Sequence, residues 1–257
     1  MEKTRTEMRP DGIVVFTIQR PAVRNAIDFD VMENLKKVIQ EVKENAACKA
    51  LVITGNGEEA FCSGGDLSVF HGLHTKEEAY SMLSKMGHIL YELLTLNRPT
   101  IALLNGAAVG GGCELATACD FRIARSGAKF GFVQGKLGIT TGWGGGTMLL
   151  QKLTYDKACQ LLYSAGTYTV EYGEQIGFIH NLIEDPNWKD AGIRWTGELV
   201  LNSSPAVLSS YKEIAVRKWI DLHMKDRMLI EIEQCSRLWE SDEHHKAVET
   251  FLQKKHK

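Results

Sequence analysis

The sequence predicts an α/β protein with a mostly parallel sheet in its first half and helices in the remainder. Two observations support this. Between residues 13 and 124, short apolar runs alternate with amphipathic stretches, which is typical of right-handed strand-helix-strand crossovers. From about residue 147 onward, helical periodicity replaces the strand signal. A chain of 257 residues accommodates one large domain, or a core with an appended helical region.

The individual elements follow in order along the chain. Residues 13–19 are β-branched and apolar, and Asp28 then caps a helix whose apolar positions run at helical spacing from Val31 to Val42. A long helix is expected over about 76–96. Further buried strands are expected at 50–54, 100–105 and 120–124, and later helices at 155–165, 170–177, 188–203, 205–217 and 221–239.

Composition narrows the class of protein. Hydrophobic residues make up 44% and charged residues 24% of the chain, as in ordinary globular proteins. The six cysteines form no C-x-x-C pair and have no histidine at zinc-finger spacing, so no metal site is expected. A net charge of -2 gives no basic footprint for nucleic acid. With neither a leader-like N-terminus nor an apolar span, a cytoplasmic protein without membrane contact is expected.

Two glycine-rich turns, at 60–67 (AFCSGGDL) and 105–114 (NGAAVGGGCE), each follow a strand-like run and precede an expected helix. Glycine lets the chain turn tightly and lets a ligand approach the backbone, while a helix start offers unpaired N–H donors. Together the turns can direct two N–H groups at one oxygen, as an oxyanion hole does. The simpler alternative is that these glycines only make tight turns.

These turns, with further matching stretches, resemble the crotonase (enoyl-CoA hydratase/isomerase) superfamily. The matching stretches are 19–21 (QRP), 25–26 (NA), 60–67, 110–120, 136–139 (KLGI) and 142–145 (GWGG). The resemblance implies a spiral ββα core over 1–195, a helical trimerisation region over 196–257, and a homotrimer or dimer of trimers. It also implies an acyl-CoA substrate with no separate cofactor, and Gly65 and Gly111 as the two oxyanion donors.

The resemblance further implies where the coenzyme A portion of the substrate binds. Arg24 is the residue available for a phosphate, although a plain surface charge is the alternative reading of this arginine. The implied coenzyme A contacts are Arg24, Ala26, Ala60, Ser63, Gly64, Asp66 and Leu67.

The sequence departs from the family's hydratases at one catalytic position. Those enzymes use two glutamates, and Glu114 matches one of them. Alignment on the LGI stretch puts Gln134 at the second position, and the other possible alignment puts Lys136 there. No Asp or Glu occurs between residues 121 and 155, and a neutral amide cannot accept a proton productively, so efficient hydration is not expected.

Decarboxylation of a malonyl-type thioester fits these residues better, because loss of carbon dioxide yields the enolate without a base. Lys136, if it pointed inward, would attract the substrate carboxylate. The alternative is that it faces solvent, as lysines commonly do. The segments 132–139 and 142–145 also resemble ethylmalonyl-CoA decarboxylases of this superfamily, with departures at Gly135 and Thr140-Thr141. Trp143 is expected at the acyl end of the pocket, with a core tryptophan as the alternative.

Two other functions stay open at this point. One is an enoyl-CoA hydratase or isomerase that relies on Glu114, alone or with a carboxylate from elsewhere in the fold. The other is a family member that binds CoA or RNA without chemistry, since fold does not fix function. The charge balance argues against RNA.

Overall fold

The computed structural model describes residues 2–255 and centres on a six-stranded sheet in the order β1-β2-β3-β5-β7-β10. Its strands are β1 (Thr4–Met8), β2 (Ile13–Ile18), β3 (Ala50–Gly55), β5 (Thr100–Leu104), β7 (Phe121–Arg125) and β10 (Asn181–Ile183). All neighbours pair in parallel except β1, which is antiparallel to β2. The prediction of an α/β fold with a mostly parallel sheet is confirmed.

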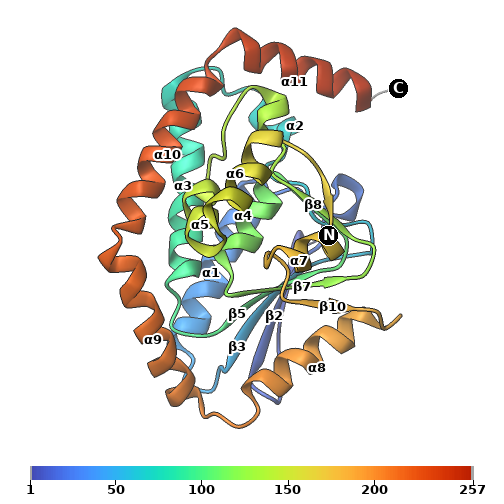
Figure 1. The fold of residues 1–257 in the computed structure, drawn as a ribbon, viewed down its shortest axis with the longest axis vertical. Helices are drawn as coiled ribbons and strands as arrows, with labels where there is room; N and C mark the ends of the chain where they lie inside the picture. The colour runs from blue at the N-terminus through green and yellow to red at the C-terminus, as the bar shows by residue number, and fades with distance from the viewer. Residues whose placement is uncertain (1, 256–257) are drawn as a thin grey trace.

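Both faces of this sheet are covered, which explains why its central strands are buried along their whole length. Alternate side chains of each strand enter two separate cores, as the period of two requires. The larger core packs under α1 (Phe29–Glu44), α3 (Lys76–Leu94) and α4 (Gly111–Ala118), and the smaller under α8 (Trp188–Val200) (Figure 1).

A second, four-stranded sheet in the order β4-β6-β8-β9 carries the two glycine-rich turns. Its strands are only two or three residues long: β4 (Ala60–Cys62), β6 (Ala107–Val109), β8 (Lys129–Gly131) and β9 (Tyr168–Thr169). The remaining short elements are α2 (Leu67–Phe70), the 3₁₀ turns η1 (Pro21–Val23) and η2 (Gln134–Leu137), and α5 (Gly145–Lys152), α6 (Tyr155–Ser164) and α7 (Val170–Gln175). Of these, α7 packs on β8 and β9, and α5 packs on α4 and α10.

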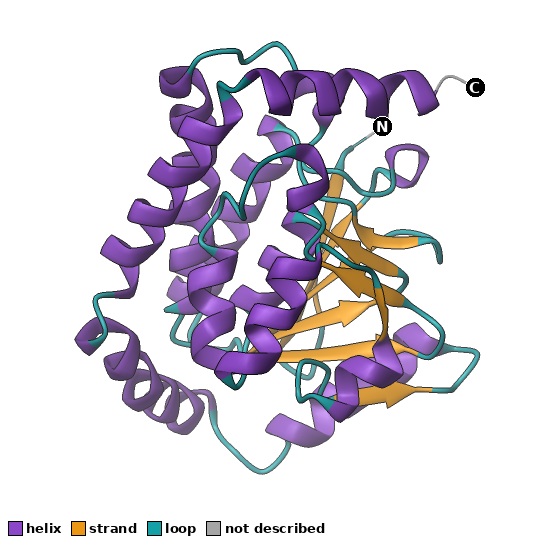
Figure 2. Ribbon diagram, turned by 45° about the horizontal axis from the view of Figure 1, so that its top comes forward, coloured by secondary structure: helices purple, strands orange, loops and turns teal. Residues whose placement is uncertain are grey.

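The C-terminal helices wrap the outside of the core (Figures 1 and 2). α9 (Pro205–Asp221) leads into α10 (Met224–Trp239), which packs along α3, and α11 (Asp242–Lys255) then crosses over η2. The boundary expected at residue 195 between the core and the C-terminal helical region falls inside α8, which packs on the large sheet. The outer helices that follow α8 begin at Pro205. None of the helices in the described part of the chain is long and apolar enough to cross a membrane.

Candidate active site

The two glycine-rich turns meet at the ends of neighbouring strands. β4 and β6 pair in parallel, so their carboxyl ends lie at the same edge of the small sheet. Gly64 has a φ of +94°, and a Cβ added there would lie 3.0 Å from the backbone nitrogen of Gly111. Gly64, Gly65 and Gly111 all line one pocket, so the predicted juxtaposition of the turns is present.

The backbone N–H groups of Gly65 and Gly111 are free to bind a ligand. Beside Gly65, the bridge to Ile27 uses only the carbonyl of Gly64 and the N–H of Asp66. Gly111 is the first residue of α4, where the N–H has no partner within the helix. Within residues 2–255 neither amide donates to another group, so both meet the requirement for oxyanion donors.

Close packing explains why glycine is required in the second turn. A Cβ at Gly111 would come within 2.2 Å of the Trp143 ring, and one at Gly112 within 2.0 Å of the Cys62 carbonyl oxygen. Trp143 is itself 3% exposed, lines the pocket and lies next to Gly65 and Gly111.

Glu114 lies one turn into α4 with its carboxylate in the same pocket. Its Oε1 accepts hydrogen bonds from Gln134 Nε2 at 2.9 Å and from the Gly142 N–H at 3.2 Å. Its Oε2 accepts from the Trp143 N–H at 2.8 Å and the Gly145 N–H at 2.9 Å. Four donors therefore occupy the four acceptor directions of the carboxylate and fix its orientation.

Burial, followed by the negative charge of Glu231 on α10, raises the pKa of Glu114 to about 7, although the backbone donors of 142, 143 and 145 oppose the rise. Glu231 accepts hydrogen bonds from the Thr141 hydroxyl and from the N–H groups of Gly146 and Thr147. The two carboxylates thus hold one loop between them, and Glu231 disfavours the ionisation of Glu114. A pKa near neutrality lets Glu114 exchange a proton at physiological pH.

Gln134 is the group that faces Glu114 from η2, which favours the alignment that put Gln134 rather than Lys136 at the second catalytic position. Gln134 and Leu137 line the pocket because residues three apart share a face of a 3₁₀ turn. Lys136 lies off that face and is exposed, so it does not point inward, and the condition for it to attract a substrate carboxylate is not met.

The pocket is apolar at its acyl end. Its empty volume is about 610 Å³ with the solvent-open mouth included. Among the described residues, its lining contains Glu114 as the one charged side chain. Side chains from three helices, α2, α3 and α10, and from the 139–143 loop supply the apolar surface: Leu67, Phe70, Met82, Leu83, Ile139, Trp143, Cys235 and Trp239.

The predicted coenzyme A contacts lie together beside this pocket. The Ser63 N–H donates to the Arg24 carbonyl, and the Ile27 N–H donates to the Gly64 carbonyl, so the segments 24–27 and 60–67 run side by side. Ser63, Gly64 and Leu67 line the pocket, whereas Ala26 and Ala60 are buried and Arg24 is exposed.

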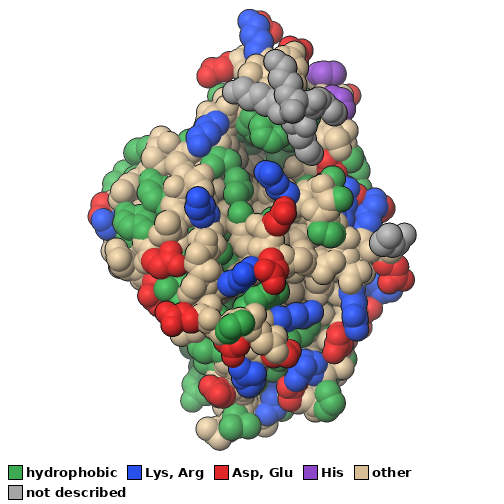
Figure 3. All heavy atoms as spheres, turned by 90° about the vertical axis from the view of Figure 1, so that its right-hand side faces the viewer, with side chains coloured by type: hydrophobic (Ala, Val, Ile, Leu, Met, Phe, Trp, Pro, Cys, Tyr) green, Lys and Arg blue, Asp and Glu red, His purple; other side chains and the backbone are tan. Residues whose placement is uncertain are grey.

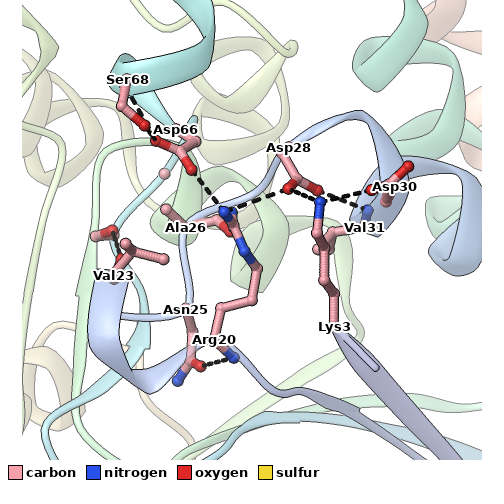
Figure 4. A network of polar contacts seen from close by, with 12 residues as sticks. Lys3, Arg20, Val23, Asn25, Ala26, Asp28, Asp30, Val31, Asp66 and Ser68 are labelled. Atoms are coloured by element: carbon pink, nitrogen blue, oxygen red, sulfur yellow. Dashed lines mark hydrogen bonds and ion pairs between the residues drawn. The ribbon is translucent and has the colours of Figure 1, made fainter. Parts of the chain in front are cut away.

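Asp66 has a structural task in addition to its predicted one. Its carboxylate caps α2 through the Ser68 N–H and pairs with Arg20 at 2.8 Å, while Arg20 and Lys3 both pair with Asp28 (Figure 4). Burial alone would raise the pKa of Asp66, but the hydrogen bonds from Ser68 and Arg20 outweigh it and lower the pKa. This network fixes the entrance to the first glycine-rich turn.

Sequence reasoning missed two contributions from the C-terminal helices. Glu231 and Trp239 of α10 reach the site from more than a hundred residues after Glu114, and α11 holds η2 through a contact of 2.7 Å between His244 Nδ1 and the Leu137 carbonyl oxygen. Their only sequence signal was a helical period, which does not specify the partner of a helix.

Within residues 2–255, His, Cys, Asp and Glu form no cluster of three or more that could hold a metal.

Comparisons with known proteins agree with this geometry. Residues 8–257 match the family model described as enoyl-CoA hydratase/isomerase. The chain is 29% identical to a short-chain-enoyl-CoA hydratase of Clostridium acetobutylicum, over 99% of this chain and 97% of that protein. It is 30% identical to an ethylmalonyl-CoA decarboxylase of Danio rerio, over 82% of this chain and 70% of that protein.

The fold is similar to that of an enoyl-CoA hydratase from Bacillus halodurans, with a TM-score of 0.88 at 23% identity over 97% of this chain and all of that one. The family model covers nearly the whole chain and includes both glycine-rich turns and Glu114. This chain therefore belongs to the enoyl-CoA hydratase/isomerase family of the crotonase superfamily, whose members process acyl-CoA thioesters.

Proposed function

We propose that this protein decarboxylates a short malonyl-type acyl-CoA. One observation carries the proposal: Glu114 faces the amide of Gln134 where the family's hydratases have a second carboxylate. Glu231 does not replace that carboxylate, because it lies outside the described lining of the pocket and is bound by Thr141 and the start of α5. A two-carboxylate hydration mechanism therefore lacks one partner.

In the proposed reaction, the amides of Gly65 and Gly111 bind the thioester oxygen. The bond between the α-carbon and the carboxylate breaks, its electron pair moves into the enolate, and carbon dioxide leaves. Protonated Glu114 then gives its proton to the α-carbon, so that one proton is consumed for each carbon dioxide released. Fixed amide dipoles suit this chemistry because they stabilise the enolate oxygen without reorganising.

The apolar acyl end supports the same reaction. Phe70, Leu83 and Trp143 surround the space beyond the oxyanion donors, and the described lining offers no cation to a substrate carboxylate. Moving a carboxylate from water into an apolar site raises its free energy, whereas neutral carbon dioxide has no comparable desolvation cost. The pocket thus favours the product over the charged reactant.

Hydration or isomerisation that relies on Glu114 is the second candidate. It is supported by the names of relatives such as the short-chain-enoyl-CoA hydratase of Clostridium acetobutylicum and a crotonyl-CoA hydratase of Syntrophomonas wolfei. A pKa near neutrality would serve Glu114 in either proton transfer. Binding of RNA has weaker support, since basic and acidic side chains are interspersed on the face in Figure 3.

The test is to incubate the purified protein separately with crotonyl-CoA, methylmalonyl-CoA and ethylmalonyl-CoA and to follow each thioester by mass. Loss of carbon dioxide from a malonyl-type substrate, with little addition of water to crotonyl-CoA, is expected. Rapid hydration without decarboxylation would favour the second candidate, and tight acyl-CoA binding without any turnover would indicate a non-catalytic member.

Self-association into a trimer, or a dimer of trimers, belongs to the same proposal. Large apolar side chains project into solvent from α6 and α9, where a monomer gains nothing from exposing them. They are Tyr155 and Tyr163 on α6 and Val207, Tyr211, Ile214 and Ile220 on α9.

The proposed coenzyme A site in each subunit consists of Arg24, Ala26 and the 60–67 turn.

A further inference from the structure

Gln134 lines the pocket, and its amide oxygen is unpaired in the described structure. Its Nε2 donates to Glu114 Oε1 at 2.9 Å, and its Oε1 is buried without a hydrogen-bond partner in the described structure. The residue lines the pocket and is 8% exposed. An ionised carboxylate only accepts hydrogen bonds, so ionised Glu114 fixes this orientation of the amide and leaves the Oε1 acceptor unpaired.

This arrangement opposes a carboxylated acyl group. A carboxylate beside Gln134 would meet the lone pairs of Oε1 and the charge of Glu114. None of the titratable groups described around Glu114 supplies a positive charge. Glu231 on α10 is a carboxyl group whose pKa is raised by burial, and Cys113 on α4 and Cys235 on α10 are thiols whose pKa values are raised by burial. Within the described residues, the lining contains no Lys, Arg or His.

Protonation of Glu114 removes both its negative charge and the lone pairs of Gln134 Oε1 from the path of the substrate carboxylate. If Glu114 takes up a proton, it becomes a donor, and the Gln134 amide can turn over so that Oε1 accepts from Glu114. Nε2 then faces the pocket as a donor to an anion. We propose that a carboxylated acyl-CoA binds with uptake of one proton by Glu114 and inversion of the Gln134 amide, an inference that rests on the proposed decarboxylation.

The cost of this change is small at neutral pH because the pKa of Glu114 is about 7. The N–H groups of Trp143 and Gly145 still hold its Oε2. The proton loaded in this way is the one that the α-carbon needs after carbon dioxide leaves. Its transfer forms the carbon–hydrogen bond, leaves Glu114 ionised, and returns the Gln134 amide to its first orientation.

The test uses calorimetric titration of the whole protein in two buffers of different ionisation enthalpy, which counts the protons taken up on binding. Sulfoacetyl-CoA is the probe, since its sulfonate mimics the carboxylate and cannot leave as carbon dioxide. Acetyl-CoA is the control, because it shares every titrating group of coenzyme A. From a pKa of about 7, we expect sulfoacetyl-CoA to take up most of one proton more than acetyl-CoA at about pH 8, and little more at about pH 6.

Gln134→Met keeps the size of the side chain and removes the amide. We expect this variant to bind acetyl-CoA and to lose roughly tenfold or more in affinity for sulfoacetyl-CoA, a loss typical of a charge-assisted hydrogen bond. Equal proton uptake for the two ligands in the wild type, or an undiminished affinity of Gln134→Met for sulfoacetyl-CoA, would overturn the inference.

The outcome also separates this inference from the proposed function. Decarboxylation of ethylmalonyl-CoA without a difference in proton uptake would overturn the amide inversion and leave the proposed function standing. A clear difference in proton uptake, with no turnover of any malonyl-type thioester, would overturn the proposed function and support the inversion as a means of recognising an anion.

Discussion

At the scale of single residues, Glu114 is better placed to give a proton than to activate water. Four donors already occupy its acceptor directions, so a water molecule has no free lone pair to approach while the group is ionised. Burial and Glu231 nevertheless bring its pKa to about 7, so the acid form is well populated at neutral pH. These two facts favour protonation of an enolate over hydration.

The pH dependence of the reaction follows from this pKa. The proposed decarboxylation requires the acid form of Glu114, so kcat/KM for ethylmalonyl-CoA should fall as pH rises through about 7. Glu114→Gln should lose roughly 10²- to 10⁴-fold in turnover, the usual contribution of a general acid, together with this pH dependence. Steady-state rates across the pH range check both, and full turnover by Glu114→Gln with every active substrate would refute this role.

The oxyanion donors can be tested at Gly111. In Gly111→Ala the new Cβ would collide with Trp143 and displace the backbone N–H, so kcat/KM should fall about 10²- to 10³-fold. Gly72→Ala is the matched control, because a Cβ there meets nothing within 4 Å. Thermal melting of both variants shows whether the fold is retained. A folded Gly111→Ala protein with wild-type turnover would contradict the assignment.

Some of the site could be predicted from residue types alone. The two glycine-rich turns and Glu114 form local sequence patterns, because the residues that each turn needs, and the carboxyl group that follows the second turn, lie within a few neighbouring positions. The direction of Lys136 could not be predicted, because it depends on the 3₁₀ turn at 134–137, whose sequence gives no sign of a three-residue period.

At the scale of elements, α10 sets the electrostatics of the site from outside it. Its Glu231 binds the start of α5 and repels the charge on Glu114. Long buried strands and amphipathic helices were predicted well because their periods extend over many residues. The small sheet as a whole was missed because strands of two or three residues, such as β9, show no period, and β1 because its exposed face breaks the apolar run.

The electrostatic role of α10 predicts the effect of Glu231→Gln. Removal of a like charge favours ionisation of Glu114, so its pKa should fall, and the decline of kcat/KM should move to lower pH. Glu233→Gln, on the same helix but paired with Lys76 at the surface, should leave the profile unchanged. A profile that stays in place for Glu231→Gln, in a folded protein, would show that the two carboxylates do not interact.

At the scale of the whole molecule, the C-terminal helices close the pocket on one side and expose apolar surface on the other. Trp239 lines the pocket from α10, whereas Tyr211 and Ile214 of α9 are 69% and 61% exposed. The exposed apolar side chains of α9 would be buried if this outer surface packs against other subunits. The sequence predicted helices here but could not specify what covers them, because helical periodicity identifies an apolar face and not its partner.

Sedimentation equilibrium tests the assembly. The wild type, with a chain mass of 28.7 kDa, should sediment as a trimer or a dimer of trimers. Ile214→Glu should shift the distribution toward the monomer, because a charge buried at an interface without a partner is costly. Glu213→Gln, an exposed change on the same helix, is the control. A wild type that stays monomeric at micromolar concentration would contradict the proposal.

The central claim is that the amide at position 134 makes this chain decarboxylate rather than hydrate. Its most direct test compares the wild type with Gln134→Glu on ethylmalonyl-CoA and crotonyl-CoA, each followed by mass. The wild type should release carbon dioxide and add little water, whereas Gln134→Glu should lose decarboxylation and gain hydration, because it restores a second carboxylate beside Glu114. Rapid hydration by the wild type, without decarboxylation, would contradict the account.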